Sequence, residues 1–97
     1  MIVAYVPDLM DRSKVAAAGD VTFVTRPADL AAHGDATVIV DLSRPDVLDV
    51  LPTIGSARII GFASHVDHDL MDAARAAGCT EVLPRSAFFG RLAELMR

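Results

Sequence analysis

Asp41 is the residue best placed for chemistry, because it directly follows the apolar run Val38–Val40. Such a run is typical of a strand covered on both faces, and its end would lie at the sheet edge where open α/β folds bind ligands. Asp8 and Arg85 also follow apolar runs and could reach the same edge. A cluster of these three groups could serve chemistry, or it could hold loops together through ion pairs without any ligand.

The second candidate is a pair of histidines, His65 and His68, which are flanked by Asp67 and Asp69. An H-x-x-H spacing beside carboxylates matches a zinc site in outline, but no third ligand is marked elsewhere. We therefore favour an exposed helix start whose acids complement the helix dipole. Cys79 is the single cysteine, and no catalytic histidine is marked for it, so we expect a packed side chain.

Strand-like and helix-like segments alternate along the chain, which predicts parallel strands joined by crossovers. The predicted strands are Ile2–Val6, Val21–Val24, Thr37–Val40, Arg58–Phe62 and Glu81–Leu83. The predicted helices are Met10–Ala18, Pro27–Ala32, Pro45–Leu51, a fourth helix capped by Ser64 and ended by Gly78, and Ser86–Met96. We expect Gly19 to cap the first helix in a left-handed conformation and Pro52 to stop the third.

The bulk composition favours one domain over residues 1–97, with 53% hydrophobic residues and a formal net charge of −4. The negative charge argues against binding to nucleic acid or to an anionic membrane, since both select for clustered Lys and Arg.

No apolar run approaches the roughly 20 residues of a membrane span. No secretory signal pattern is present, and we expect a cytoplasmic protein. No glycine-rich loop follows the first strand, which argues against nucleotide binding.

The stretch from Val38 to Asp46 resembles the third strand and following loop of bacterial response-regulator receiver (CheY-like) domains. In that family the strand ends in the phosphate-accepting aspartate, and a proline follows four residues later. Ile59–Ser64, Ala76–Cys79 and Val82–Ser86 are similar to the fourth strand, a helix end and the lysine–proline segment of the family. The resemblance spans the whole chain and implies a three-layer α/β sandwich whose five-stranded parallel sheet has the flavodoxin-like order 2-1-3-4-5.

The resemblance places a phosphate acceptor at Asp41, but this chain departs from the family at the metal site. Receivers carry two acids after the first strand, which hold Mg²⁺ together with the acceptor, whereas Tyr5–Asp8 offers Asp8 for one position only. A Mg²⁺ site would then consist of Asp8, Asp41 and the Ser43 carbonyl, and it would be weak because one carboxylate is lost.

Three further departures concern the groups that act on the phosphate in the family. Arg85 aligns with the phosphate-pairing lysine, and its planar fork differs from a compact ammonium. Ala63 aligns with the switch hydroxyl, so only the neighbouring Ser64 could supply one. Val82 aligns with the switch aromatic, so the family's rotamer change is expected to be missing.

The last predicted helix carries more apolar side chains than one core-facing stripe requires. Phe88 and Phe89 belong to this excess, and Met71 lies on the preceding helix. In receivers the fourth helix, fifth strand and fifth helix form the usual dimer and output face. We therefore expect these residues to form a contact surface, with a homodimer as the simplest partner arrangement.

These observations favour a stand-alone pseudo-receiver that signals through protein–protein contact, without obligatory phosphorylation, cofactor or enzymatic activity. The first alternative is a true receiver that accepts a phosphoryl group on Asp41 with Mg²⁺. The second is a small-molecule binder at the carboxyl ends of the strands.

Overall fold

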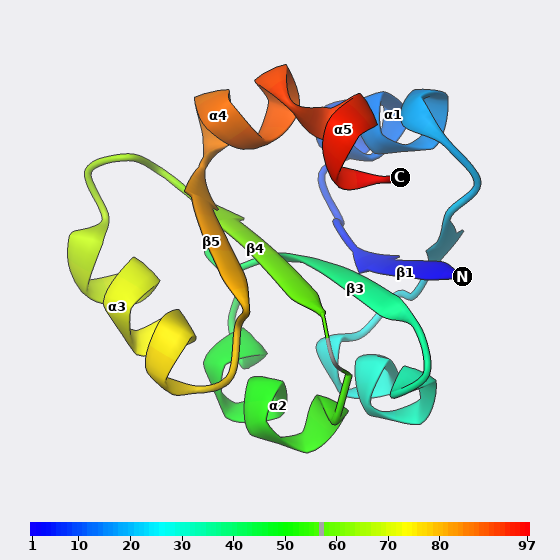
Figure 1. The fold of residues 1–97 in the computed structure, drawn as a ribbon. Coiled ribbons are helices and arrows are strands. Elements are labelled where there is room, and N and C mark those ends of the chain that lie inside the picture. The colour runs from blue at the N-terminus through cyan, green and yellow to red at the C-terminus, as the bar shows by residue number, and fades with distance from the viewer. Residues whose placement is uncertain (57) are drawn as a thin grey trace.

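A five-stranded parallel sheet forms the centre of the molecule in the computed structural model, which describes residues 1–56 and 58–97 (Figure 1). In chain order the strands are β1 (Ile2–Tyr5), β2 (Thr22–Phe23), β3 (Thr37–Asp41), β4 (Ile59–Ala63) and β5 (Glu81–Pro84). Across the sheet their order is β2-β1-β3-β4-β5, and every neighbouring pair is parallel. The predicted fold class and strand order are confirmed.

Helices cover both faces of this sheet and complete three layers (Figure 1). One face carries α1 (Leu9–Ala18), α4 (Arg85–Gly90) and α5 (Leu92–Leu95). The other face carries the 3₁₀-helix η1 (Pro27–His33), α2 (Val47–Ile54) and α3 (His68–Ala76). Within the described residues, no helix is long and apolar enough to cross a membrane.

Two separate apolar cores follow from the alternation of side chains along buried strands. Val38 and Val40 of β3 join the core under α2 and α3, whereas Ile39 joins the core under α1 and α4. In the latter core the rings of Phe62 and Phe88 stack with centroids 4.5 Å apart. Both faces of β3 are therefore dry, which explains its continuous apolar sequence.

The prediction that Pro52 stops the third helix is wrong. Pro52 lies inside α2, which continues to Ile54 and ends at Gly55 in the left-handed conformation (φ 69°). Leu51 and Ile54 are both buried in the core. We attribute the longer helix to this packing, which offsets the hydrogen bond that Pro52 cannot donate.

Three other helical predictions also need correction. Gly19 follows α1 in an extended conformation (φ 170°), not a left-handed one. The segment after Pro27 is a 3₁₀-helix and not an α-helix. The predicted helix Ser86–Met96 is divided at Arg91 into α4 and α5. Gly90, a poor helix former, immediately precedes this break.

Candidate functional site

Asp41 is the last residue of β3, and the residue is 2% exposed. Its Oδ1 accepts hydrogen bonds from the Ser43 backbone N–H at 3.0 Å and from the Ser43 hydroxyl at 2.7 Å. Its Oδ2 faces Nε of Arg44 at 3.4 Å. Both carboxylate oxygens are therefore engaged within the next three residues, in the pattern of an Asx turn.

The loop after Asp41 begins with Leu42, whose side chain packs against Gly61 of β4. An added Cβ at Gly61 would lie only 2.7 Å from the Leu42 side chain, so any larger residue there would force Leu42 to shift. The Leu42 side chain is fully buried. The Leu42 N–H also donates to the Phe62 carbonyl at 3.0 Å, so the start of the β3–α2 loop is bonded to β4.

Arg85 is the first residue of α4, and its Nη2 donates to Oδ1 of Asp11 at 2.6 Å. Asp11 lies in the first turn of α1 and is 4% exposed. The Arg85 guanidinium also lies over the rings of Phe62 and Phe89, at 5.4 and 5.3 Å from their centroids. The hydrogen bond to Asp11, followed by the charges of Asp11, Asp41 and Asp8, raises the pKa of Arg85.

The expected cluster of Asp8, Asp41 and Arg85 is thus only partly correct. All three groups lie at the carboxyl edge of the sheet, near enough for the two carboxylates to influence Arg85 electrostatically. The hydrogen-bond partner of Arg85, however, is Asp11. Sequence reasoning missed Asp11, although a second acid three residues after Asp8 was visible and could have been considered for this edge.

Asp8 serves as the N-cap of α1. Its Oδ1 accepts hydrogen bonds from the backbone N–H groups of Met10 and Asp11, each at 3.0 Å. The bond from Asp11 makes the largest contribution to lowering the pKa of Asp8, and the positive charges of Arg44 and Arg85 lower it further. The local role of Asp8 is therefore to satisfy the helix start.

The residues at this edge do not fit the Mg²⁺ site considered from the sequence. The carboxylates of Asp8 and Asp41 are already hydrogen-bonded, that of Asp8 to the N–H groups of Met10 and Asp11 and that of Asp41 to the N–H and hydroxyl of Ser43. Arg44 and Arg85 bring two positive charges to the place where a divalent cation would need negative ones. In the described part of the chain, no three His, Cys, Asp or Glu residues are grouped so that they could hold a metal ion.

Ser64 lies directly after β4 and is exposed, but it does not cap the following helix as predicted. The α3 helix begins at His68, and Ser64 instead closes a turn in which its carbonyl accepts from the Asp67 N–H at 3.0 Å. Val66, expected in the apolar stripe of this helix, lies in the turn and is 70% exposed.

The expected contact surface of Met71, Phe88 and Phe89 is wrong for its first two members. Met71 lies on the core-facing side of α3 and is buried, and Phe88 lies on the core-facing side of α4 and is fully buried. Phe89 is half-buried and contacts the rings of Phe62 and Phe88 edge-on. The apparent excess of apolar residues near the C-terminus is thus used largely in the core.

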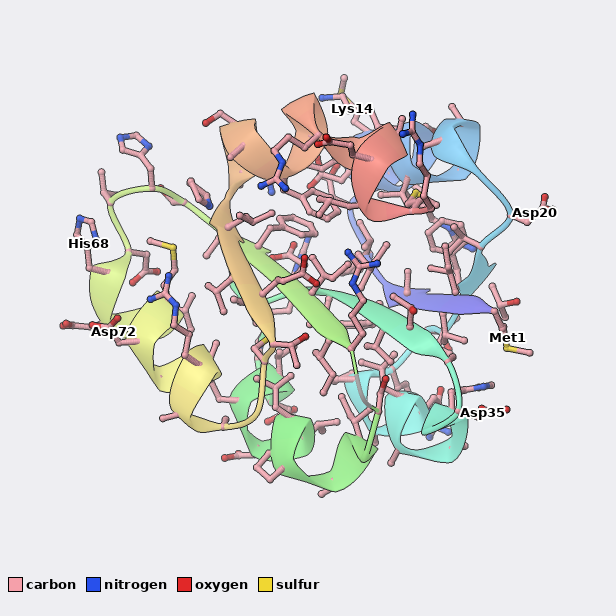
Figure 2. All side chains as sticks on the ribbon, viewed as in Figure 1. Met1, Lys14, Asp20, Asp35, His68 and Asp72 are labelled. Carbon is pink, nitrogen blue, oxygen red and sulfur yellow. The ribbon has the colours of Figure 1, made fainter. Side chains whose placement is uncertain are left out.

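The histidines and the cysteine form no site with one another. His65 and His68 are exposed, and Figure 2 shows His68 pointing outward from the start of α3. Cys79 is buried, and burial raises the pKa of its thiol to about 11. A thiol in that state is protonated near neutral pH and is a poor nucleophile.

The whole fold is similar to a solved structure. It superposes on a candidate pilus assembly protein (cpaE) from Burkholderia thailandensis with a TM-score of 0.66, covering 98% of this chain and 93% of that one. The two sequences are 15% identical, so the likeness concerns the fold. No protein-family model and no curated protein matches the chain. The strand order and this likeness together establish a flavodoxin-like α/β fold.

Proposed function

We propose that this chain is a pseudo-receiver, a receiver-like domain that acts through protein–protein contact without accepting a phosphoryl group. The observation that carries the proposal is the ion pair between Arg85 and the buried Asp11. In the resemblance to receivers, Arg85 corresponds to the lysine that pairs with the phosphate. Here the Arg85 guanidinium is already paired with Asp11.

Phosphoryl transfer depends on cations that neutralise the charge developing on the transferred group, and on a nucleophile aimed at it. At this edge the Arg85 guanidinium already has a carboxylate partner and two aromatic faces. Both oxygens of Asp41 are bound by Ser43 and Arg44. The edge is arranged to stabilise its own loops, which supports a role in contact over one in catalysis.

The solved neighbour offers a second line of support. It is described as a candidate pilus assembly protein, and assembly is a process of protein–protein contact. We propose a role of that general kind for this chain, as an interaction module within a larger protein system.

The test is exposure of the protein to acetyl phosphate and Mg²⁺, followed by intact mass measurement over time. We expect no adduct of phosphoryl mass on the wild type. Asp46→Asn is the matched control, because Asp46 is an exposed acid in the same loop. An adduct that forms on the wild type and on Asp46→Asn, and disappears in Asp41→Asn, would overturn the proposal in favour of a true phosphoacceptor.

A further inference from the structure

We propose that a second copy of this chain inserts the start of its α1 into a groove beside Asp41, in a reciprocal dimer. The inference rests on the proposed contact function and names the partner. It assigns one surface to Leu9, Met10, Arg12 and Lys14, called here the α1 patch. It assigns the complementary surface to a groove between the β3–α2 loop and the N-terminal ends of α2 and α3.

The groove has a volume of about 440 Å³. Its apolar lining comes from Leu42, Pro45, Leu48 and Leu70. Leu48 and Leu70 are only half-buried, so part of their apolar surface faces the open groove. A docked aliphatic side chain would remove this surface from water, which is the main favourable contribution to such contacts.

The rim of the groove carries an excess of negative charge. Asp46, Asp49 and Asp67 are exposed, and none of the three has an ion-pair partner among residues 1–56 and 58–97. The one cation of the rim, Arg44, is directed to Asp41. A purely apolar partner would leave these carboxylates poorly hydrated, so the groove fits a segment that combines apolar side chains with cations.

The α1 patch has that combination. Leu9 and Met10 are 78% and 73% exposed, while Asp11 and Val15 form the buried side of the same helix. Arg12 follows Leu9 by three residues and Lys14 follows Met10 by four. These spacings place each cation next to its apolar residue on the helix surface.

Both cations of the patch lie close to aromatic rings of the same chain. The Arg12 guanidinium lies 4.6 Å from the centroid of Phe23, and Nζ of Lys14 lies 5.1 Å from that of Phe89. Figure 2 shows Lys14 projecting from the outer side of α1. Cation–ring contacts of this kind are weak at exposed sites, so both cations remain able to pair with carboxylates of a second copy.

The position of the two surfaces allows a closed dimer. Both lie at the carboxyl edge of the sheet, with the α1 patch on one face and the groove on the other. Consider a two-fold axis that lies in the plane of the sheet and runs along this edge. Rotation about it places the second copy edge to edge with the first, with the two faces of its sheet exchanged. The α1 face of each copy then meets the α2–α3 face of the other. The same contact is made twice, as a two-fold symmetric interface requires.

The test is light scattering over a concentration series that reaches about 1 mM, the weak end of specific affinities. We expect the wild type to be dimeric at the upper end. Lys14→Glu and Asp49→Lys each place like charges in both contacts, and we expect each to weaken the dimer by about tenfold or more. Met10→Asp should do the same by charging the apolar centre of the patch.

The decisive measurement mixes the Lys14→Glu and Asp49→Lys proteins. In a mixed pair the two reversed charges attract in one contact, while the other contact keeps its original charges. The mixture should therefore recover the dimer that neither protein forms alone. Ala93→Asp is the control, because Ala93 is exposed on α5, outside both the α1 patch and the groove, and it should leave the dimer unchanged.

A wild type that stays monomeric throughout the series would overturn the inference, as would a dimer indifferent to Lys14→Glu or a mixture that stays monomeric. All of these substitutions are on exposed residues, and equal melting temperatures would verify that the variants fold. The readout is independent of the phosphoryl-mass measurement. A failure of this dimer is therefore distinguishable from a failure of the proposed function.

Discussion

Two buried aspartates, Asp11 and Asp41, lie at the same edge of the sheet and are used in opposite ways. Asp41 is bonded within its own loop, to Ser43 and Arg44. Asp11 is bonded to Arg85, which is 74 residues away in the chain. The first contact shapes one loop, whereas the second joins the start of α1 to the start of α4.

This difference indicates where the edge derives its stability. A local bond adds little constraint, because its partners are already close in the unfolded chain. A long-range ion pair with one buried member leaves an unpaired charge when it is broken, and that charge is costly. We therefore expect the Asp11–Arg85 pair to matter more for folding than the contacts of Asp41.

The largest expected effect is that of Arg85→Ala, which leaves the buried Asp11 carboxylate without its partner. We expect a loss of about 2–3 kcal/mol in the free energy of unfolding, below the full range for a buried pair because the Arg85 side chain is 42% exposed. Urea denaturation monitored by circular dichroism measures it.

Arg75→Ala is the control for that measurement, since Arg75 pairs with Asp72 on the exposed side of α3. Loss of this surface pair should cost about 0.5 kcal/mol or less. Equal losses in Arg85→Ala and Arg75→Ala would contradict the special role of the Asp11 contact.

An intermediate effect is expected for Asp41→Ala, which removes the acceptor for both Ser43 bonds. We expect a loss of about 1–2 kcal/mol, and less than half of that for Asp41→Asn, whose amide oxygen can still accept from Ser43. The same urea titration compares the two variants. If Asp41→Ala were more damaging than Arg85→Ala, the comparison between the two aspartates would be reversed.

The smallest expected effect is a change in the pH dependence of stability in Asp8→Asn. The pKa of Asp8 is lower in the folded state than its ordinary value, so the charged form stabilises the fold. That stabilisation is present above the ordinary Asp range and is lost as the pH falls through the lowered folded pKa, below about pH 4.

Thermal melts of the wild type and Asp8→Asn from neutral to acidic pH measure this effect. The wild type should be the more stable protein near pH 7, and the difference should shrink at acidic pH as Asp8 is protonated. A difference that stays constant across the range would show that the capping geometry matters and the charge does not.

The strands were more predictable than the helix ends. For β3 the predicted and observed bounds differ by one residue at one end, and for β4 by one residue at each end, because a strand buried on both faces must be apolar throughout. The helix ends depended on competing contacts. Pro52 was overridden by the packing of Leu51 and Ile54, and the Ser64 cap gave way to a turn.

One part of the candidate site was predictable from the sequence and another part was not. The position of Asp41 at the sheet edge follows from the strand pattern, and its local bonds are those that an aspartate before a turn commonly makes. The pairing of Arg85 could not be read from the chain, because three acids of similar type stand near that edge. Only the orientation of α1 brings Asp11 to the guanidinium.

The sequence by itself determined the alternation of strands and helices, the parallel sheet and the edge at which its polar residues gather. Those features follow from local hydrophobic patterns and from the limited number of ways to cover such a sheet. The tertiary structure alone decided which acid holds Arg85, which apolar residues are buried and which remain exposed on α1. These outcomes depend on distances between segments far apart in the chain, and local patterns carry no information about those distances.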